Sequence, residues 1–207
     1  MKNKLVNLHK FCIKYQIYFY LGMALLLVAD LVSKKVIESF LLERGGRVEV
    51  IKNFFTLSLV YNPGAFSGML GGSLFGQIIL VLLSLVCGVL MIYYFAKFYS
   101  KINNFERFGL LLAIPGTLGN LVDRVLMVFN IQEGVIDFLE FNLGFMVWNT
   151  FNLADSLLVV GIIAFAIGYL IRDHKDSKKK EKEREEFYSQ KQNEDSSSEN
   201  KDEKTDS

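Results

Sequence analysis

The sequence contains few of the side chains that soluble enzymes use for catalysis and metal binding. It has two cysteines, Cys12 and Cys87, and two histidines, His9 and His174, among its 207 residues. Two cysteines without a Cys-x-x-Cys pair provide neither a disulfide framework nor a zinc site. The histidines lie near opposite ends of the hydrophobic part of the chain, which argues against a histidine metal cluster and against a Ser-His-Asp triad.

The sequence also has almost no net charge, with 23 basic and 22 acidic residues, so it gives no indication of a nucleic-acid partner. The charges are unevenly distributed, because residues 172–207 hold 10 of the basic and 12 of the acidic side chains. This tail cannot form a hydrophobic core, and we expect it to be disordered or a lone solvated helix. Residues 1–171 are about 60% hydrophobic, above the roughly 45–50% of soluble domains, which argues against an ordinary cytosolic enzyme.

Four stretches of residues 1–171 are long and apolar enough to cross a membrane as helices. A bilayer core about 30 Å thick needs roughly 20 predominantly apolar helical residues. The predicted spans cover residues 15–37, 74–96, 105–129 and 148–171, approximately. The sequence therefore predicts one membrane domain, an all-α bundle of four transmembrane helices, followed by the charged tail 172–207.

Basic residues flank these spans unevenly. Lysines precede the first span, and lysines and arginines lie between the second and third spans and after the fourth. The loop between the third and fourth spans carries only acidic charges. Because basic flanks stay in the cytoplasm, we expect both termini on the cytoplasmic side and the other two loops outside.

The first outer loop, about residues 40–73, has a pattern of its own. Val48–Ile51 and Phe54–Tyr61 are rich in β-branched and aromatic residues, and they are bounded by Gly45-Gly46 and by Asn62-Pro63-Gly64. This pattern predicts two short strands joined by a turn. We expect a small extracytoplasmic β-sheet between the first and second spans, resting on the outer membrane face.

Charged and amide side chains inside the predicted spans are costly in lipid, so each is a functional candidate. Asp30 and Lys34 lie four residues apart on the first span and can form an ion pair at the outer membrane boundary. Asn120 and Asp123 share one face of the third span, whereas the adjacent Arg124 points elsewhere. These residues could also act only as a buried network that fastens the third span to its neighbours.

Two further aspartates fall at one outer level of the membrane. Asp137 lies in an extended apolar segment of the second outer loop, and Asp155 is predicted about two turns inside the fourth span. Taken singly, Asp137 could be an exposed loop acid and Asp155 a helix cap. Two carboxyl groups held close together cannot both ionise, so one can deprotonate a water molecule while the other protonates the substrate. Such a pair hydrolyses peptide bonds without a metal, a serine or a histidine.

Three other functions remain open at this point. A transporter or channel would relay protons through acids near the midplane of the membrane, although here the informative acids cluster near one face. A peptidase using Ser33 and Lys34 is a second alternative, with poor geometry because helical neighbours point in different directions. A magnesium or calcium site formed by Asp137, Asp155 and Asn152 is a third.

Five segments carry these polar residues in a characteristic order. They are Asp30-Leu-Val-Ser-Lys34, Asn62-Pro-Gly-Ala-Phe66, Gly116-Thr-Leu-Gly-Asn-Leu-Val-Asp-Arg124, Val135-Ile-Asp-Phe138 and Phe151-Asn-Leu-Ala-Asp155. With four spans at matching spacing, the chain resembles the lipoprotein signal peptidases (signal peptidase II), which are aspartic peptidases of the bacterial inner membrane. Members of that family usually have a proline shortly before the last segment, where this chain has Asn149-Thr150, and their tails are typically shorter.

The resemblance implies that Asp137 and Asp155 are the catalytic dyad. It also implies that six residues line or brace the substrate site: Asn62, Gly116, Asn120, Asp123, Arg124 and Asn152. Asp30 and Lys34 resemble a pair in the first span of the family that is considered structural.

The resemblance further implies a substrate and a place of action. The substrate is a prolipoprotein whose cysteine already carries diacylglycerol, and the cut falls just before that cysteine. A small periplasmic sheet cradles this substrate, which fits residues 48–67. We therefore expect a monomeric aspartic endopeptidase of the bacterial inner membrane, in contact with membrane lipids, without a metal or cofactor, and with its active site near the outer face.

Overall fold

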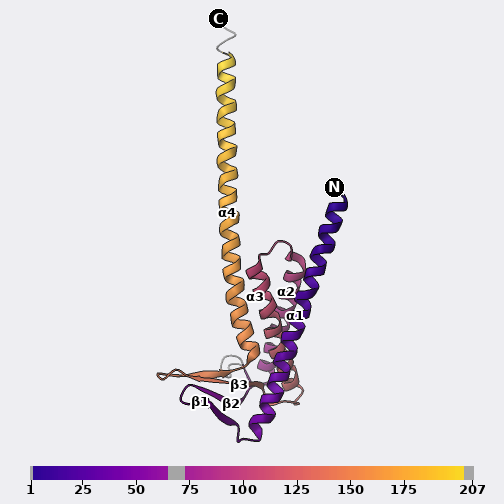
Figure 1. Cartoon of the computed structure of the whole chain (residues 1–207), viewed down its shortest axis with the longest axis vertical. Helices are drawn as coiled ribbons and strands as arrows, with labels where there is room; N and C mark the ends of the chain where they lie inside the picture. The colour runs from indigo at the N-terminus through magenta and orange to yellow at the C-terminus, as the bar shows by residue number, and fades with distance from the viewer. Residues whose placement is uncertain (1, 65–72, 203–207) are drawn as a thin grey trace.

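The computed structural model describes residues 2–64 and 73–202, with side chains for residues 15–64 and 73–189. Its four long helices are α1 (Lys2–Leu42), α2 (Leu74–Phe98), α3 (Asn104–Val128) and α4 (Leu153–Asp202). Each contains a stretch long and apolar enough to cross a membrane. The helices form a bundle with a small sheet at one end (Figure 1), so the predicted membrane bundle with a small sheet is confirmed.

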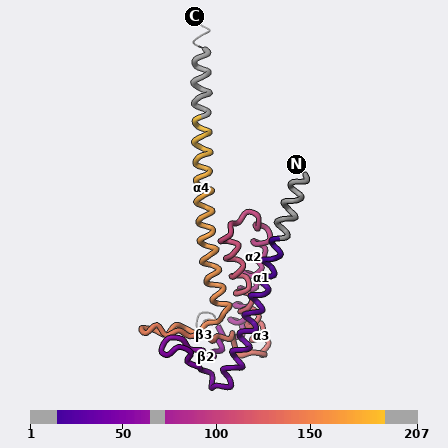
Figure 2. Tube along the Cα trace, viewed as in Figure 1, coloured from indigo at the N-terminus to yellow at the C-terminus, as the bar shows by residue number. Residues whose placement is uncertain are grey.

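The fourth helix differs most from its predicted span. It begins at Leu153 rather than near residue 148, because residues 147–151 form a strand. At its other end α4 extends far beyond the rest of the bundle, away from the sheet (Figure 2). Residues 172–189 of the charged tail thus continue α4 as an exposed helix, which fits the solvated-helix alternative.

Helix α3 lies at the centre of the bundle. Half of its most apolar 18-residue window is buried, against 11–17% for the corresponding windows of the other three helices. Polar side chains on α3 can therefore meet side chains from α1 and α4 out of contact with lipid. This explains how the polar residues of the third predicted span are accommodated.

The backbones of α3 and α4 touch along a line of glycines. A Cβ at Gly161 would lie 2.6 Å from the backbone nitrogen of Ala113 and 2.7 Å from the carbonyl oxygen of Gly109. A Cβ at Gly116 would lie 2.5 Å from the carbonyl oxygen of Ala154. Small residues allow such close approach of helices in membranes. Gly116 therefore lets the start of α4 lie directly against α3.

The sheet has four antiparallel strands in the order β1-β2-β3-β4. The strands are β1 (Arg47–Ile51), β2 (Phe55–Asn62), β3 (Val135–Asn142) and β4 (Val147–Phe151). The first two match the predicted strands. Strands β3 and β4 come from the segment between α3 and α4, where the sequence predicted an extended stretch around Asp137 but no sheet. An isolated two-stranded hairpin is marginally stable in water, and the two loops therefore stabilise each other. Residues 65–72 of the first outer loop lie outside the described residues.

The sheet is anchored to the end of α1. Leu41 of α1 forms a small buried core with Ile136 and Phe138 of β3. Beside this core, Tyr61 of β2 donates a 2.7 Å hydrogen bond to Glu38 of α1. The contacts hold β3, and with it Asp137, against the ends of the helices.

The glycine contact between α3 and α4 can be tested by adding a single methyl group. Gly161→Ala should destabilise the protein by about 1–3 kcal/mol, because the new Cβ meets backbone atoms that cannot move aside. Gly88→Ala in α2 is the matched control, since its Cβ would lie 3.4 Å from the nearest atom, a side-chain carbon of Leu118. Thermal unfolding in detergent should give a lower melting temperature for Gly161→Ala than for Gly88→Ala. Equal melting temperatures would contradict the tight contact.

Candidate active site

Asp155 lies in the first turn of α4, where it forms a reciprocal cap with Asn152. Asn152 precedes the helix, and its Oδ1 accepts a 2.9 Å hydrogen bond from the backbone N–H of Asp155. In return, Asp155 Oδ2 accepts a 3.1 Å hydrogen bond from the backbone N–H of Asn152. This is the geometry of a capping box. The prediction that Asp155 lies two turns inside the span is therefore wrong, and the carboxylate sits at the helix N-terminus, where the helix dipole favours negative charge.

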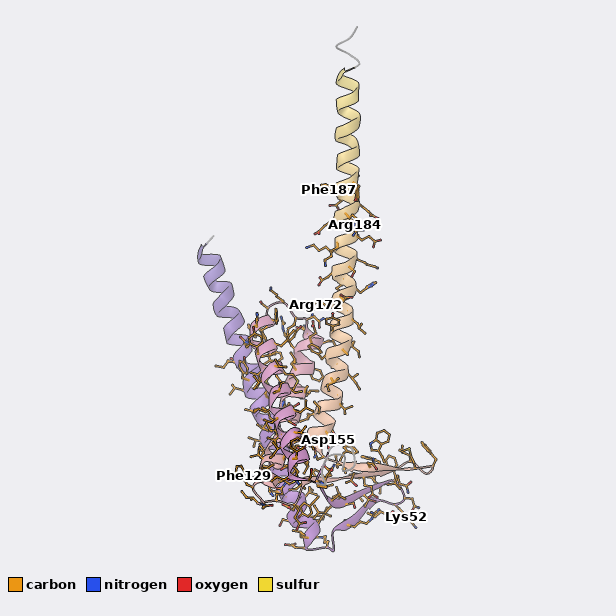
Figure 3. All side chains as sticks on the ribbon, turned by 180° about the vertical axis from the view of Figure 1, so that it is seen from behind. Lys52, Phe129, Asp155, Arg172, Arg184 and Phe187 are labelled. Atoms are coloured by element: carbon orange, nitrogen blue, oxygen red, sulfur yellow. The ribbon has the colours of Figure 1, made fainter. Side chains whose placement is uncertain are left out.

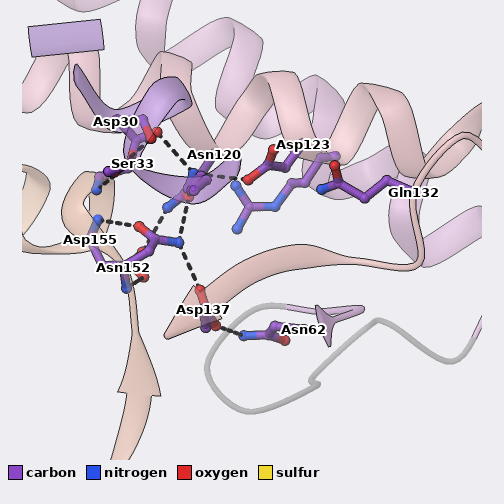
Figure 4. Close-up of polar contacts among 12 residues, drawn as sticks. Asp30, Ser33, Asn62, Asn120, Asp123, Gln132, Asp137, Asn152 and Asp155 are labelled. Carbon is purple, nitrogen blue, oxygen red and sulfur yellow. Dashed lines mark hydrogen bonds and ion pairs between the residues drawn. The ribbon is translucent and has the colours of Figure 1, made fainter. Parts of the chain in front are cut away.

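Asp137 approaches this cap from β3. Its Oδ1 accepts a 2.7 Å hydrogen bond from Asn152 Nδ2, and its Oδ2 accepts a 3.0 Å hydrogen bond from Asn62 Nδ2 at the end of β2. Asn62 Oδ1 in turn accepts a hydrogen bond from the backbone N–H of Gly64, which fixes the turn after β2. Asn152 thus donates hydrogen bonds to both aspartates, one through its side chain and one through its backbone (Figure 4).

A buried lysine lies behind the two aspartates. The ammonium nitrogen of Lys34, which is 1% exposed, is 2.9 Å from Asp30 Oδ2 and 2.9 Å from Asp123 Oδ2. It also donates a 3.0 Å hydrogen bond to Asn120 Oδ1. Asp30 Oδ1 accepts a 2.8 Å hydrogen bond from the backbone N–H of Ala154. This group of contacts ties α1, α3 and the start of α4 together.

Lys34 also fixes the direction of the amide groups at the site. An ammonium group only donates hydrogen bonds, so Asn120 must turn its oxygen toward Lys34 and its NH₂ group away from it. Asn120 Nδ2 then donates a 2.7 Å hydrogen bond to Asp155 Oδ1. Asn152 Nδ2 donates to the same Asn120 oxygen at 3.1 Å. The lysine therefore determines, through Asn120, that an amide N–H points at Asp155.

Burial raises the pKa of Asp137 to about 7, and the negative charge of Asp155 contributes to the rise. The amide donors of Asn62 and Asn152 oppose this effect. A carboxyl group with a pKa near 7 exists in both its protonated and its ionised form at neutral pH. That property suits a group that gives and takes a proton during catalysis.

Arg124 is a positively charged residue that interacts with this pair. Its strongest charge interactions are with Asp155 and Asp137, followed by Asp123. One guanidinium nitrogen donates a 3.4 Å hydrogen bond to Ser84 of α2, and its buried Nε has no hydrogen-bond partner among the described residues. Ser84 was not identified from the sequence, although a serine inside an otherwise apolar span is a signal that could have found it.

The structure brings the predicted site residues to one place. Hydrogen bonds and ion pairs link Asn62, Asp137, Asn152, Asp155, Asn120, Lys34, Asp30 and Asp123. Arg124 joins this network through its charge, and Gly116 through its packing against the start of α4. Asp30 and Lys34 are therefore part of the network and not a separate ion pair at the membrane boundary.

The alternatives fit this geometry poorly. In a metal site formed with Asp137 and Asp155, Asn152 would ligate through its oxygen, but it turns its NH₂ group toward Asp137 and its oxygen toward the Asp155 N–H. Among the described residues, no group of three or more His, Cys, Asp or Glu side chains is suited to hold a metal. The amine of Lys34 is held by three acceptors, and the Ser33 hydroxyl donates to the Asp30 carbonyl oxygen, so neither is free to act as a base or nucleophile.

A proton path through the membrane would need further polar groups at intermediate depths. Residues 156–171 of α4 carry no charged side chain between Asp155 and Arg172. Figure 3 shows Asp155 at the sheet end of the bundle and Arg172 far from it along α4. Arg172 pairs there with Glu106, at 2.9 Å, and closes the opposite end of the bundle. This separation argues against a transporter.

Two adjacent lysines allow a direct test of the buried ammonium group. Lys34→Met leaves Asp30 and Asp123 buried without their partner, which should cost about 3–5 kcal/mol. Lys35→Met removes an exposed lysine paired with Glu38 and should change stability by about 0–1 kcal/mol. Thermal unfolding of both variants in detergent measures this difference. If the two variants melted at the same temperature, Lys34 would not hold the network together.

Comparison with known proteins adds an independent observation. The family model described as Signal peptidase (SPase) II matches residues 22–171 of the chain. The lipoprotein signal peptidase of Clostridium novyi (strain NT) is 38% identical over 135 residues, which are 65% of this chain and 84% of that protein. The lipoprotein signal peptidase of Sulfurihydrogenibium sp. (strain YO3AOP1) is 35% identical over 153 residues, which are 72% of this chain and 89% of that protein.

Solved structures show the same architecture. A bacterial membrane enzyme determined by the in meso method at 2.3 Å resolution has a TM-score of 0.61 and 28% identity, covering 77% of this chain and 90% of its own. A second such structure, at 1.9 Å resolution, has a TM-score of 0.60 and 29% identity, covering 74% of this chain and 92% of its own. The match to the family model ends at residue 171, where the charged tail begins.

Proposed function

The chain belongs to the signal peptidase II family, and from this premise we propose that it is a membrane-embedded aspartic endopeptidase with Asp137 and Asp155 as its catalytic pair. The relatives named lipoprotein signal peptidase support the removal of signal peptides from lipoproteins as its reaction. The observation that carries the proposal is the shared donor Asn152, which hydrogen-bonds to both aspartates. Two carboxyl groups from separate elements, β3 and α4, are thereby held around one point.

In the proposed reaction, one aspartate is ionised and the other is protonated when the substrate binds. The ionised carboxylate takes a proton from a water molecule as the water oxygen attacks the scissile carbonyl carbon. The protonated carboxyl group gives its proton to the carbonyl oxygen, which forms a tetrahedral diol. The proton on the first aspartate then passes to the leaving nitrogen, the C–N bond breaks, and the second aspartate recovers its proton from the diol.

The surroundings of the two carboxyl groups suggest which of them holds the proton. Asp155 lies at a helix N-terminus and accepts hydrogen bonds from a backbone N–H and from the side chain of Asn120. Asp137 is 2% exposed, and its pKa is raised to about 7. We assign the resting proton to Asp137 and the activation of water to Asp155.

The remaining residues of the network position this pair. Asn62 donates to Asp137 and binds the backbone of the turn that follows β2, so it couples the position of that turn to the dyad. Arg124 stabilises the negative charge of the pair.

The place of the dyad supports a substrate with one part in the membrane. Asp155 lies in the first turn of a helix whose next 16 residues are free of charge. The lipid chains of a diacylglyceryl cysteine could remain in the bilayer while the peptide bond just before that cysteine reaches the two aspartates. We propose this substrate class, with membrane lipids as the only other partners. We also propose that the protein acts as a monomer.

The proposed orientation places both termini in the cytoplasm and the sheet outside the inner membrane of a bacterium. Single cysteines in a Cys12→Ser, Cys87→Ser background test it, at Gly45 in the turn between α1 and β1 and at Lys178 in the tail. An impermeant thiol reagent added to intact cells should label position 45 and not position 178. The reverse pattern would invert the topology and place the dyad on the cytoplasmic side.

Replacing either aspartate by asparagine tests the catalytic assignment. Asparagine keeps the size of the side chain but cannot cycle between acid and base, so Asp137→Asn and Asp155→Asn should each reduce cleavage of a diacylated prolipoprotein by at least about 10²–10⁴-fold. The double variant should be scarcely slower than either single variant, because the groups act as a unit. Cleavage is measured with purified protein in detergent, with and without a metal chelator.

Glu140→Gln is the matched control for this experiment. Glu140 lies on β3 three residues from Asp137, but it pairs with Arg47 on the other face of the sheet. This variant should retain most of the cleavage rate, and the chelator should have no effect on any protein. Substantial cleavage by either asparagine variant, or loss of wild-type activity with the chelator, would refute the aspartic mechanism.

A further inference from the structure

The hairpin formed by β3 and β4 carries an apolar tip that the proposed reaction does not use. Residues 141–154 contain no charged side chain. Four consecutive residues around the turn and the start of β4 are exposed, namely Phe145 at 83%, Met146 at 44%, Val147 at 55% and Trp148 at 53%. So many exposed apolar side chains in one short hairpin indicate a surface that is covered by something other than water.

The two faces of this hairpin differ in polarity. Asp137 points toward the helix ends, where it meets Asn152, and Phe141 lies on the same face of β3 because alternate residues of a strand share a face. Phe141 stacks against Phe55 of β2 and Phe151 of β4, with ring centroids 4.9 and 5.9 Å apart.

Trp148 is directly opposite Phe141 in the register of β3 and β4, so it extends the same aromatic face toward the tip. The opposite face carries Glu140, which pairs with Arg47, together with the polar Thr56 beside it. The aromatic face is therefore turned to the membrane side of the sheet, and the charged face is turned away from it.

The hairpin also lies at the right height to meet a membrane surface. Figure 1 shows it extending sideways from the bundle at the level where α4 begins. At the same end of the bundle, Phe75 in the first turn of α2 and Phe129 after α3 are 74% and 70% exposed, and Figure 3 labels Phe129 there. Aromatic residues at one level are typical of the boundary between lipid and water. The β3–β4 hairpin lies at the same level and extends outward from the helices.

We propose that the β3–β4 hairpin is an interfacial membrane anchor, whose aromatic face and apolar tip lie in the lipid leaflet on the sheet side of the bilayer. Its partner is the boundary between lipid head groups and acyl chains. The tip Phe145-Met146-Val147-Trp148 supplies the buried apolar area, and Trp148 places its indole N–H near the head groups. Because β3 carries Asp137 between the bundle and this anchor, the anchor fixes the height of that carboxyl group relative to the membrane.

The position of Trp148 can be read directly, because it is the only tryptophan in the chain. Full-length protein in lipid nanodiscs is titrated with aqueous iodide, and a parallel sample contains lipids brominated in the upper acyl chain. Two references are made in a Trp148→Phe background: Leu85→Trp, at an exposed position in the middle of α2, and Lys178→Trp, on the exposed tail. We expect brominated lipid to quench the fluorescence of Trp148 strongly. We expect iodide to quench Trp148 several-fold less than it quenches the tail reference, Lys178→Trp.

A charge at the tip gives a second measurement. Phe145→Asp should raise the iodide quenching of Trp148 several-fold and lower the quenching by brominated lipid. Asn53→Asp, at the turn between β1 and β2, is the control and should change neither. Iodide quenching of wild-type Trp148 equal to that of the tail reference would overturn the proposal. Protection from both quenchers would also overturn it, and would indicate a protein partner or a second copy of the chain on this face.

Discussion

The structure depends most on one buried ammonium group. Lys34 brings together Asp30 of α1, Asp123 and Asn120 of α3, and through Asp30 the backbone of Ala154 at the start of α4. A charge inside a membrane bundle is costly unless it is fully paired. The pairing requires three helices to keep one arrangement, and the direction of the amide groups at the active site follows from it.

The proposed active site lies where this bundle meets the sheet. Asn152 is the single residue between β4 and α4; it caps α4 through its oxygen and donates from its NH₂ group to Asp137. The same residue therefore serves the fold and the chemistry. Both carboxyl groups are therefore rigidly supported. Asp155 belongs to the capped helix, and Asp137 belongs to a strand that Ile136 and Phe138 anchor on α1. The proposed hairpin anchor would add the membrane itself to these supports.

The sequence predicted the helices well, because each long apolar run must cross the membrane as a helix. It predicted β1 and β2 from their alternating β-branched and aromatic residues. It predicted no strand pairing in the second outer loop, where the residues around Asp137 were expected only as an extended segment. It assigned residues 148–151 to the fourth span, because hydrophobicity alone does not distinguish a short strand from the start of a span. The depth of Asp155 was wrong for the same reason. The meeting of Asp137 with Asp155 was anticipated through the resemblance, whereas the contact of Lys34 with Asn120 depends on the packing of α1 against α3, which no local pattern encodes.

The most direct measurement of the shared-proton mechanism is the pH dependence of kcat/KM for cleavage of a diacylated prolipoprotein. Two coupled carboxyl groups that must hold one proton between them give a bell-shaped profile. The rate should fall toward acid pH as the ionised aspartate gains a proton. It should also fall as the pH rises through about 7, where Asp137 loses its proton. A rate that rises through pH 7 to a plateau would contradict this account, because it would indicate a single base or a metal-bound hydroxide in place of the aspartate pair.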